Sequence, residues 1–394
     1  MYTVAVVTGT RADYGLLRPV LFKLARHKDI QLRLLVTGSH LSPLYGNTVS
    51  EIEADAAAGV AIDERLDILA DKAPEGRAGT AARTAAALRG GLAYFEKIKP
   101  DAVLLLGDRY EIFAMAQAAA LLDIPVAHIS GGDVTRGADD DWFRHCITKM
   151  AKLHFPSCEA YRQRLLRMGE QPGFVFNVGG LGDENIRKMK LMSLAQLKES
   201  LGLCFTGPFA LVTFHPETAA GLPPQEQAGA LLRAAEQNPG LFYLFTRANA
   251  DAGGEEMNRM AEAFCQSHAN AALFSSLGVL RYLSAMKHAA LVLGNSSSGM
   301  VETPSLGTPC VNVGGRQAGR LTSANILHCP ATTAAISRAI QKAAAPRFAS
   351  VAHRAQSPYN GGDTSGKIVR ILYRFLQNGK LKPPKIFYDG GAGV

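Results

Sequence analysis

The stretch TVAVVTGTRADYGLLRPVLFKLAR, residues 3–26, contains the structural unit from which the fold is predicted. Residues 3–8 are a short valine-rich run, which is typical of a parallel strand buried on both faces. Residues 16–26 carry apolar side chains at helical spacing and are predicted to form an amphipathic helix. A strand, a turn and a helix in this order form the repeating unit of doubly wound α/β sheets.

The same alternation continues along nearly the whole chain. Further strands are predicted at residues 31–37, 102–106, 126–129 and 175–178, and a long helix at residues 80–98. After the glycine-rich stretch at residues 179–182 the pattern restarts, with strands predicted at residues 209–213, 241–245, 272–274, 291–293 and 310–313.

We therefore predict an α/β fold of two doubly wound, Rossmann-like domains with a cleft between them. The first domain is expected at residues 1–180 and the second at residues 181–364. Residues 365–394 are expected to form a helix and a tail that pack across either domain. Because open α/β sheets bind ligands at the carboxyl ends of their strands, the residues that follow each strand are the candidates for function.

Composition excludes several classes of protein. With 394 residues, 47% of them hydrophobic and 19% charged, the chain is long enough for two ordered cores. No stretch reaches the roughly 18 apolar residues of a membrane span, and the first residues lack the features of a signal peptide, so we expect a cytoplasmic protein. The 6 cysteines form no C-x-x-C pair, and the histidines form no H-E-x-x-H motif, so we expect no structural zinc. The net charge of +8 is spread along the chain, and it suits a small phosphorylated ligand as well as nucleic acid.

Two strand-to-helix turns are candidates for binding an anion. In the turn at residues 8–15, backbone N–H groups, the positive end of a helix and the guanidinium of Arg11 can meet a phosphate. In GNSSSG, residues 294–299, three consecutive serine hydroxyls can donate to phosphate or sugar oxygens, and Glu302 can accept from the hydroxyls of a ribose. The alternative is an ordinary turn with a solvated Arg11, and a serine-rich helix cap with Glu302 complementing the helix dipole.

Carboxylates gather after two neighbouring strands of the first domain. Asp108, Arg109 and Glu111 follow one strand, and Asp133 and residues 139–141 follow the next. Acids crowded in a cleft raise one another's pKa values, which is the condition for separate general-acid and general-base roles. The alternative is that residues 139–141 cap a helix, and for at least one of the three this is the better interpretation.

Two polar side chains follow strands of the second domain. His215 can donate to a phosphate or move a proton, and Asn249 follows the next strand. A single histidine before a proline is more often an ordinary loop residue, so His215 is a candidate only together with the other polar residues near it.

Five motifs in order carry a family resemblance. They are TGTRADYGLLRPV, GDRYEIF, HISGGDV with RHCITKMAKLHFPS, VTFHPET, and GNSSSGMVETPSLGTPCVNVGGRQAGR. With them, nearly the whole chain resembles the hydrolysing UDP-N-acetylglucosamine 2-epimerases of bacterial sialic acid synthesis and the epimerase half of the bifunctional animal enzyme. Near relatives act on UDP-2,4-diacetamido-2,4,6-trideoxy-glucose for legionaminic acid, so the resemblance leaves the substrate open between the two sugars.

The resemblance implies a GT-B arrangement with the nucleotide held mainly by the second domain. It places UDP contacts at Arg11, His215, Asn249, Ser297, Glu302 and Arg316, to which we add Arg109 and Ser296. It places catalytic acids at Asp108, Asp133 and Asp140. We expect His215 to be a fourth catalytic residue. Two departures bear on Asp133 and Asp140, since some relatives carry Glu where this chain has Ser130 and the acidic run here is three residues long.

The expected reaction converts UDP-N-acetylglucosamine and water to N-acetylmannosamine and UDP, by elimination to a glycal followed by hydration. We expect a UDP-sugar as the partner, a homo-oligomer (dimer or tetramer), and neither nucleic acid, membrane, cofactor nor metal, because arginine and helix-end donors can neutralise a diphosphate. The alternatives are the diacetamido substrate, a non-hydrolysing epimerase, a GT-B glycosyltransferase and a catalytically silent UDP-sugar sensor.

Overall fold

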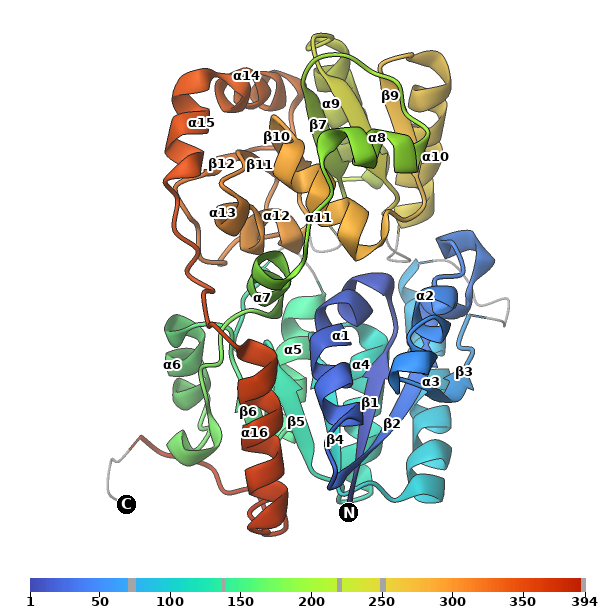
Figure 1. Ribbon diagram of the computed structural model, residues 1–394, viewed down its shortest axis with the longest axis vertical. Coiled ribbons are helices and arrows are strands. Elements are labelled where there is room, and N and C mark those ends of the chain that lie inside the picture. The colour runs from blue at the N-terminus through green and yellow to red at the C-terminus, as the bar shows by residue number, and fades with distance from the viewer. Residues whose placement is uncertain (70–75, 137–138, 218–221, 249–252, 391–394) are drawn as a thin grey trace. The chain divides into compact units, whose positions relative to one another are not determined.

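The computed structural model describes residues 1–69, 76–136, 139–217, 222–248 and 253–390 (Figure 1). The chain divides into two compact units. The first unit comprises Met1–Asp133, Asp140–Glu184 and Tyr359–Val394, and the second comprises Val134–Asp139 and Asn185–Pro358. None of the helices formed by the described residues is long and apolar enough to cross a membrane.

The first unit is built on a six-stranded parallel sheet with the strand order β3-β2-β1-β4-β5-β6. The strands are β1 (Tyr2–Thr8), β2 (Ile30–Thr37), β3 (Ile62–Leu66), β4 (Ala102–Leu106), β5 (Val126–Ile129) and β6 (Leu153–Phe155). The helices are α1 (Arg11–Ala25), α2 (Val49–Glu53), α3 (Gly76–Ile98), α4 (Tyr110–Leu121), α5 (Asp140–Met150), α6 (Glu159–Arg167) and α16 (Thr364–Gln377), with short 3-10 turns at Gly38–Leu41, Pro43–Tyr45, Ala56–Ala58 and Pro172–Phe174. Helix α7 (Leu181–Lys188) spans the boundary to the second unit.

The second unit repeats this topology, with the strand order β12-β11-β10-β7-β8-β9 in a parallel sheet. Its strands are β7 (Phe209–Thr213), β8 (Phe242–Thr246), β9 (Ala271–Phe274), β10 (Leu291–Gly294), β11 (Cys310–Val313) and β12 (Ile326–Cys329). Its helices are α8 (Leu194–Leu201), α9 (Pro224–Glu236), α10 (Gly254–Ser267), α11 (Gly278–His288), α12 (Ser297–Val301), α13 (Thr303–Leu306), α14 (Thr333–Ala344) and α15 (Pro346–His353). Each sheet reverses its order beside its first strand, which is the point where doubly wound folds bind ligands. The prediction of two doubly wound, Rossmann-like domains is confirmed.

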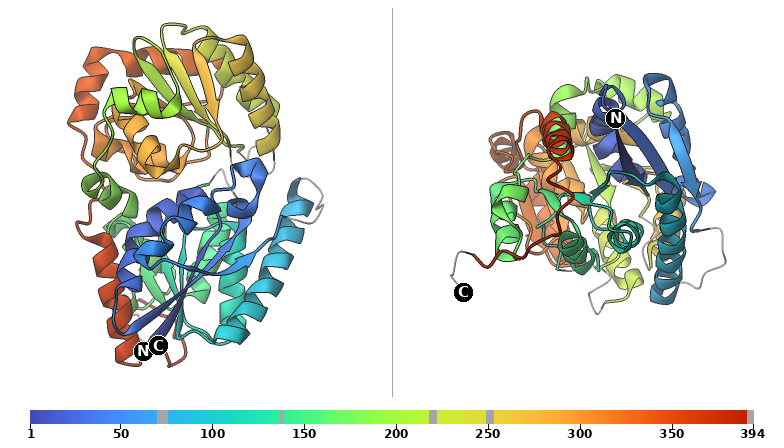
Figure 2. Two further views of the ribbon diagram at one scale, coloured as in Figure 1. Left: turned by 45° about the vertical axis from the view of Figure 1, so that its right-hand side comes forward. Right: turned by 90° about the horizontal axis from the view of Figure 1, so that it is seen from below.

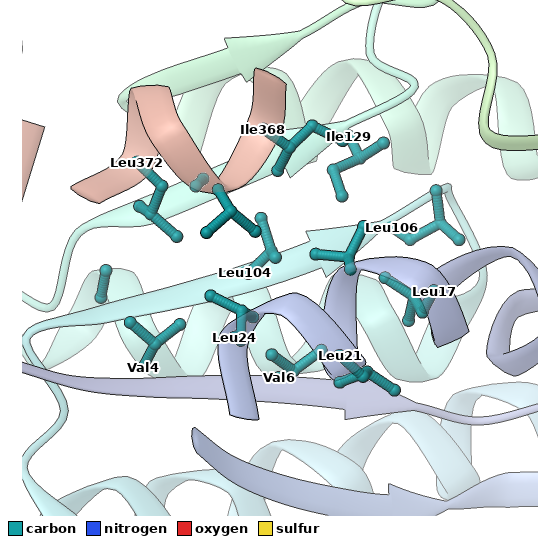
Figure 3. Close-up of a cluster of buried hydrophobic side chains, with 14 of the residues drawn as sticks. Val4, Val6, Leu17, Leu21, Leu24, Leu104, Leu106, Ile129, Ile368 and Leu372 are labelled. Atoms are coloured by element: carbon teal, nitrogen blue, oxygen red, sulfur yellow. The ribbon is translucent and has the colours of Figure 1, made fainter. Parts of the chain in front are cut away.

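Helices cover both faces of the first sheet. They must do so because successive side chains of β1 point to opposite faces and are buried on both. Val4 and Val6 pack with α1 and α16 on one face, whereas Ala5 and Val7 pack with α3 and α4 on the other. Figure 2 shows helices on both sides of this sheet. Figure 3 shows the first of these cores, in which side chains of α1 and α16 lie over β1, β4 and β5. The last helix of the chain therefore completes the core of the first unit.

Helix α7 and the start of α16 are joined by hydrogen bonds within the first unit. The carboxylate of Glu184, which is fully buried, accepts hydrogen bonds from the backbone N and the hydroxyl of Ser365 at 2.5 and 2.6 Å. Close by, the backbones of Gly179 and Gly361 approach so nearly that a Cβ on Gly179 would lie 2.2 Å from the Cα of Gly361. The contact requires glycine at both positions.

Local differences from the predicted elements have identifiable causes. Helix α1 begins at Arg11, five residues before the predicted start, because Thr10 and Asp13 form a reciprocal capping box. Residues 175–178 do not form the predicted strand, although the backbone N of Phe176 donates to the carbonyl of His154 in β6 and that of Val178 to the carbonyl of Pro156 just after it. Strand β3 was not predicted, because its sequence IDERL alternates with charged residues at the exposed edge of the sheet.

Candidate active site

In the first unit, the three predicted catalytic acids gather around one buried arginine. Arg144 of α5 has a side chain only 1% exposed and is ion-paired with Asp108, which follows β4. Burial lowers the pKa of Arg144, but the charges of Asp108, Asp133 and Asp140 raise it above its usual value. A fourth acid, Asp141, lies 3.5 Å from the same guanidinium. The predicted acids therefore share one electrostatic environment.

The acids at residues 139–141 include two that lie at the start of a helix. Asp140 and Asp141 lie in the first turn of α5, where carboxylates are stabilised by the helix dipole. Asp141 also pairs along the helix with Arg144 and lies 3.8 Å from a ring nitrogen of His145. Asp141 therefore supports the helix that carries Arg144.

A buried histidine fixes the backbone just before Asp108. The Nε2–H of His128, a fully buried residue of β5, donates to the carbonyl of Gly107 at 2.7 Å. Gly107 has a φ of 80°, a conformation that favours glycine. Burial lowers the pKa of His128 to about 3, so the ring is neutral at physiological pH. This role could not be predicted from the sequence, because the histidine lies within a strand and acts through a backbone group.

The buried state of His128 predicts a pH dependence of stability. The unfolded chain protonates this histidine near pH 6.5, whereas the folded protein does so only near pH 3. Its contribution is therefore present above pH 6.5 and is lost as the pH falls, by up to about 1.4 kcal/mol per pH unit. Urea unfolding of the wild type and of His128→Gln between pH 7 and pH 5 should give a shallower decline for the variant. Equal slopes would contradict the assignment.

The loop after β1 is organised by a buried aspartate. The carboxylate of Asp13 accepts hydrogen bonds from the backbone N of Gly9 at 3.0 Å, the backbone N of Thr10 at 2.9 Å and the hydroxyl of Thr8 at 2.8 Å. The Nε2 of His40 lies 3.0 Å from the same hydroxyl. Burial raises the pKa of Asp13, although these hydrogen bonds oppose the shift. The network holds Arg11 as the first residue of α1, at the positive end of the helix.

Arg109, a predicted substrate contact, is part of a buried ion pair. Its Nε donates to the Oε1 of Glu111 at 2.8 Å, and the two side chains are 12% and 1% exposed. Burial raises the pKa of Glu111, whereas the charge of Arg109 lowers it and also lowers that of Asp13. Arg109 therefore neutralises buried carboxyl groups beneath the β1 loop.

In the second unit, the described candidates lie on loops that follow β7, β10 and β11. His215 and Arg316 are buried. Ser296 caps α12 and Ser297 is the first residue of that helix, while Glu302, also buried, lies at the junction of α12 and α13. Asn249 lies outside the described residues. Backbone groups and hydroxyls at this edge of the sheet are the donors that a phosphate prefers.

The hydroxyls near Ser296 form a connected group. The Oγ of Ser298 lies 3.1 Å from that of Ser296 and 2.6 Å from the hydroxyl of Tyr282. The hydroxyl of Tyr282 in turn lies 3.4 Å from the hydroxyl of Thr213.

The described residues contain no group of three or more His, Cys, Asp or Glu side chains placed to hold a metal ion.

Comparisons with known proteins identify the family of the chain. Residues 22–373 match the model of the UDP-N-acetylglucosamine 2-epimerase family. The chain is 38% identical to a hydrolysing GDP/UDP-N,N'-diacetylbacillosamine 2-epimerase of Campylobacter jejuni, with 82% of this chain and 83% of that protein covered. It is 36% identical to the polysialic acid biosynthesis protein P7 of Escherichia coli, covering 99% and 98%. It is 35% identical to a hydrolysing UDP-N,N'-diacetylbacillosamine 2-epimerase of Legionella pneumophila, covering 93% and 94%.

The fold is also similar to that of a solved structure. The UDP-GlcNAc 2-epimerase of Neisseria meningitidis bound to UDP-GlcNAc superimposes with a TM-score of 0.79 at 20% identity, covering 94% of this chain and 100% of that one. The chain therefore belongs to the UDP-N-acetylglucosamine 2-epimerase family and is a hydrolysing UDP-sugar 2-epimerase.

Proposed function

We propose that the substrate is UDP-N-acetylglucosamine, and that the products are N-acetylmannosamine and UDP. The observation that carries the proposal is the gathering of Asp108, Asp133 and Asp140 around the buried Arg144. The similarity to a relative from Neisseria meningitidis that is named UDP-N-acetylglucosamine 2-epimerase, 32% identical over 92% of this chain, supports the choice of this sugar.

A second candidate substrate is UDP-N,N'-diacetylbacillosamine. Two relatives named for that substrate are 38% and 35% identical to this chain. Both candidates carry an acetamido group on C2, and the same elimination and hydration apply to either. They differ in the substituents on C4 and C6 of the sugar ring.

The chemistry explains why the protein needs both carboxylates and phosphate donors. The C2 proton of the sugar is very weakly acidic, since no carbonyl lies next to it. If the bond from C1 to the bridging oxygen breaks first, the developing oxocarbenium ion acidifies that proton, and an aspartate becomes an adequate base. UDP leaves with the bridging oxygen and C2 loses its proton, which gives a glycal. Water then adds its oxygen to C1, and a proton is delivered to the opposite face of C2.

The two units supply different parts of this reaction. In the first, Asp108, Asp133 and Asp140 share the roles of base, acid and stabiliser of the cation, and three carboxylates around one guanidinium leave the net negative charge that a cation requires. In the second, His215 and the serines at the start of α12 stabilise the charge of the departing UDP. Arg11 and Arg109 of the first unit and Glu302, Arg316 and Asn249 of the second complete the proposed set of substrate contacts.

Isotopes test this mechanism directly. In D2O the released sugar should carry one deuterium at C2, because the original hydrogen is lost and solvent replaces it. An 18O label in the bridging position should depart with UDP, and 18O-labelled water should label C1. NMR and mass spectrometry of products from the two candidate UDP-sugars measure each outcome and identify the better substrate.

Other outcomes would contradict the proposal in distinguishable ways. A released gluco-configured sugar with protium at C2 would indicate a simple UDP-sugar hydrolase. Deuterated UDP-N-acetylmannosamine without free UDP would indicate a non-hydrolysing epimerase. Binding of UDP-sugar without any product would indicate a sensor.

A further inference from the structure

Asn295 is a buried amide that joins two loops of the second unit. It follows β10 directly and is 1% exposed. Its Oδ1 accepts a hydrogen bond from the backbone N of His215 at 2.8 Å, and its Nδ2 donates to the backbone carbonyl of His215 at 2.8 Å. Both hydrogen-bonding groups of the His215 backbone are thus satisfied by one side chain.

The backbone of Asn295 also forms hydrogen bonds with a third loop. The carbonyl of Asn295 accepts from the Nε2 of Gln317 at 2.8 Å and from an Nη of Arg316 at 3.4 Å. These two residues lie on the loop after β11, and β11, β10 and β7 are neighbours in the sheet. Asn295 is therefore the point where the loops of His215, Ser296 and Arg316 meet.

The geometry of the sheet explains why a side chain is needed at this point. The register of β10 and β7 ends with the pair Gly294 and Thr213. Gly294 has a φ of 137°, and a Cβ there would lie 2.0 Å from the Thr213 carbonyl oxygen, so this close approach requires glycine. The backbone N of Asn295 still donates to that carbonyl at 3.2 Å, and beyond it the side chain of Asn295 makes the next contacts with the β7 loop. The amide of Asn295 continues the pairing by one residue, because it offers a donor and an acceptor as a backbone would.

We propose that Asn295 is a positioning residue for the diphosphate of the substrate, holding His215, Ser296 and Arg316 at their mutual distances. This inference rests on the proposed function, in which these three side chains contact UDP. The choice of an amide over a carboxylate has a physical reason. An aspartate at position 295 would lose the bond to the His215 carbonyl and would add a buried negative charge next to the loops that receive the diphosphate.

Calorimetric titration of UDP into the wild type, Asn295→Ala and Asn295→Asp tests the proposal. We expect UDP affinity to fall at least tenfold in Asn295→Ala and further in Asn295→Asp. The matched control is Asn238→Ala, which removes an amide that donates to Ala234 O at 2.8 Å and to Ser337 Oγ at 2.9 Å, in the connection that leads into β8. The control should lose thermal stability comparably and keep the wild-type UDP affinity, so that a change specific to Asn295 cannot be a general effect of lost stability.

Each result has a defined meaning. An Asn295 variant that is folded by circular dichroism and binds UDP within twofold of the wild type would overturn the inference, as would failure of both Asn295 variants to fold. If the wild type itself binds no UDP, the proposed function is wrong. Loss of affinity in Asn238→Ala as well would show that UDP binding follows overall stability, and would also overturn the specific role of Asn295.

Discussion

Replacing Asp108 with asparagine should lower turnover by a factor of about 10²–10⁴ while the affinity for UDP stays unchanged, as expected for loss of a general acid or base. Asparagine keeps the shape of the side chain and removes its charge and its basicity. Asp108 is 20% exposed and paired with Arg144, so the substitution leaves a folded protein with an altered site. Steady-state release of UDP measures turnover, and calorimetry measures UDP affinity.

Asp101 provides a matched control at the opposite end of the same strand. It precedes β4 at the amino end and accepts a hydrogen bond from the backbone N of Thr3 at 2.7 Å. Asp101→Asn should leave turnover within a factor of about two, because position 101 is remote from the carboxyl ends of the strands. Near-normal turnover of Asp108→Asn would show that Asp108 serves only as the structural partner of Arg144.

The fold could be predicted because buried parallel strands leave a strong signal. The valine-rich run of β1, followed by a helical pattern, predicts one unit of a doubly wound sheet, and its recurrence predicts two domains. Strands exposed at an edge, such as β3, lack that signal, since charged residues alternate with apolar ones. The start of α1 depends on a capping box between Thr10 and Asp13, which lies before the apolar residues from which the helix was predicted.

Candidate site residues could be predicted from the sequence where side chains carry chemistry, but not where side chains act on the backbone. Asp108, Asp133 and Asp140 stood in recognisable motifs, and the structure brings their charges together at Arg144. His128 and Asn295, in contrast, work by hydrogen bonds to carbonyl and amide groups of residues far away in the sequence. Such partners depend on which strands become neighbours, and sequence spacing does not specify that.

Replacing the buried Arg144 is expected to lower both the stability and the turnover of the protein. A side chain only 1% exposed amid carboxylates is stable there because the charges compensate one another. Arg144→Gln removes the cation and leaves the carboxylates of Asp108, Asp133 and Asp140 to repel one another. We expect the free energy of unfolding to fall by about 3–5 kcal/mol at pH 7.5, the usual cost of breaking a buried pair. We also expect turnover to fall by orders of magnitude, since the three acids lose the positive charge around which they gather.

The pH dependence of that loss distinguishes repulsion from a simple packing defect. Protonation of the carboxylates removes the repulsion, so the deficit of Arg144→Gln relative to the wild type should shrink as the pH falls from 7.5 to 5. Urea unfolding followed by circular dichroism measures it at each pH. The surface pair of Arg65 and Glu53, both 51% exposed, provides the control, and Arg65→Gln should cost no more than about 1 kcal/mol. A deficit of Arg144→Gln that is independent of pH would mean that the guanidinium fills space in the first unit and does not offset repulsion among the three acids.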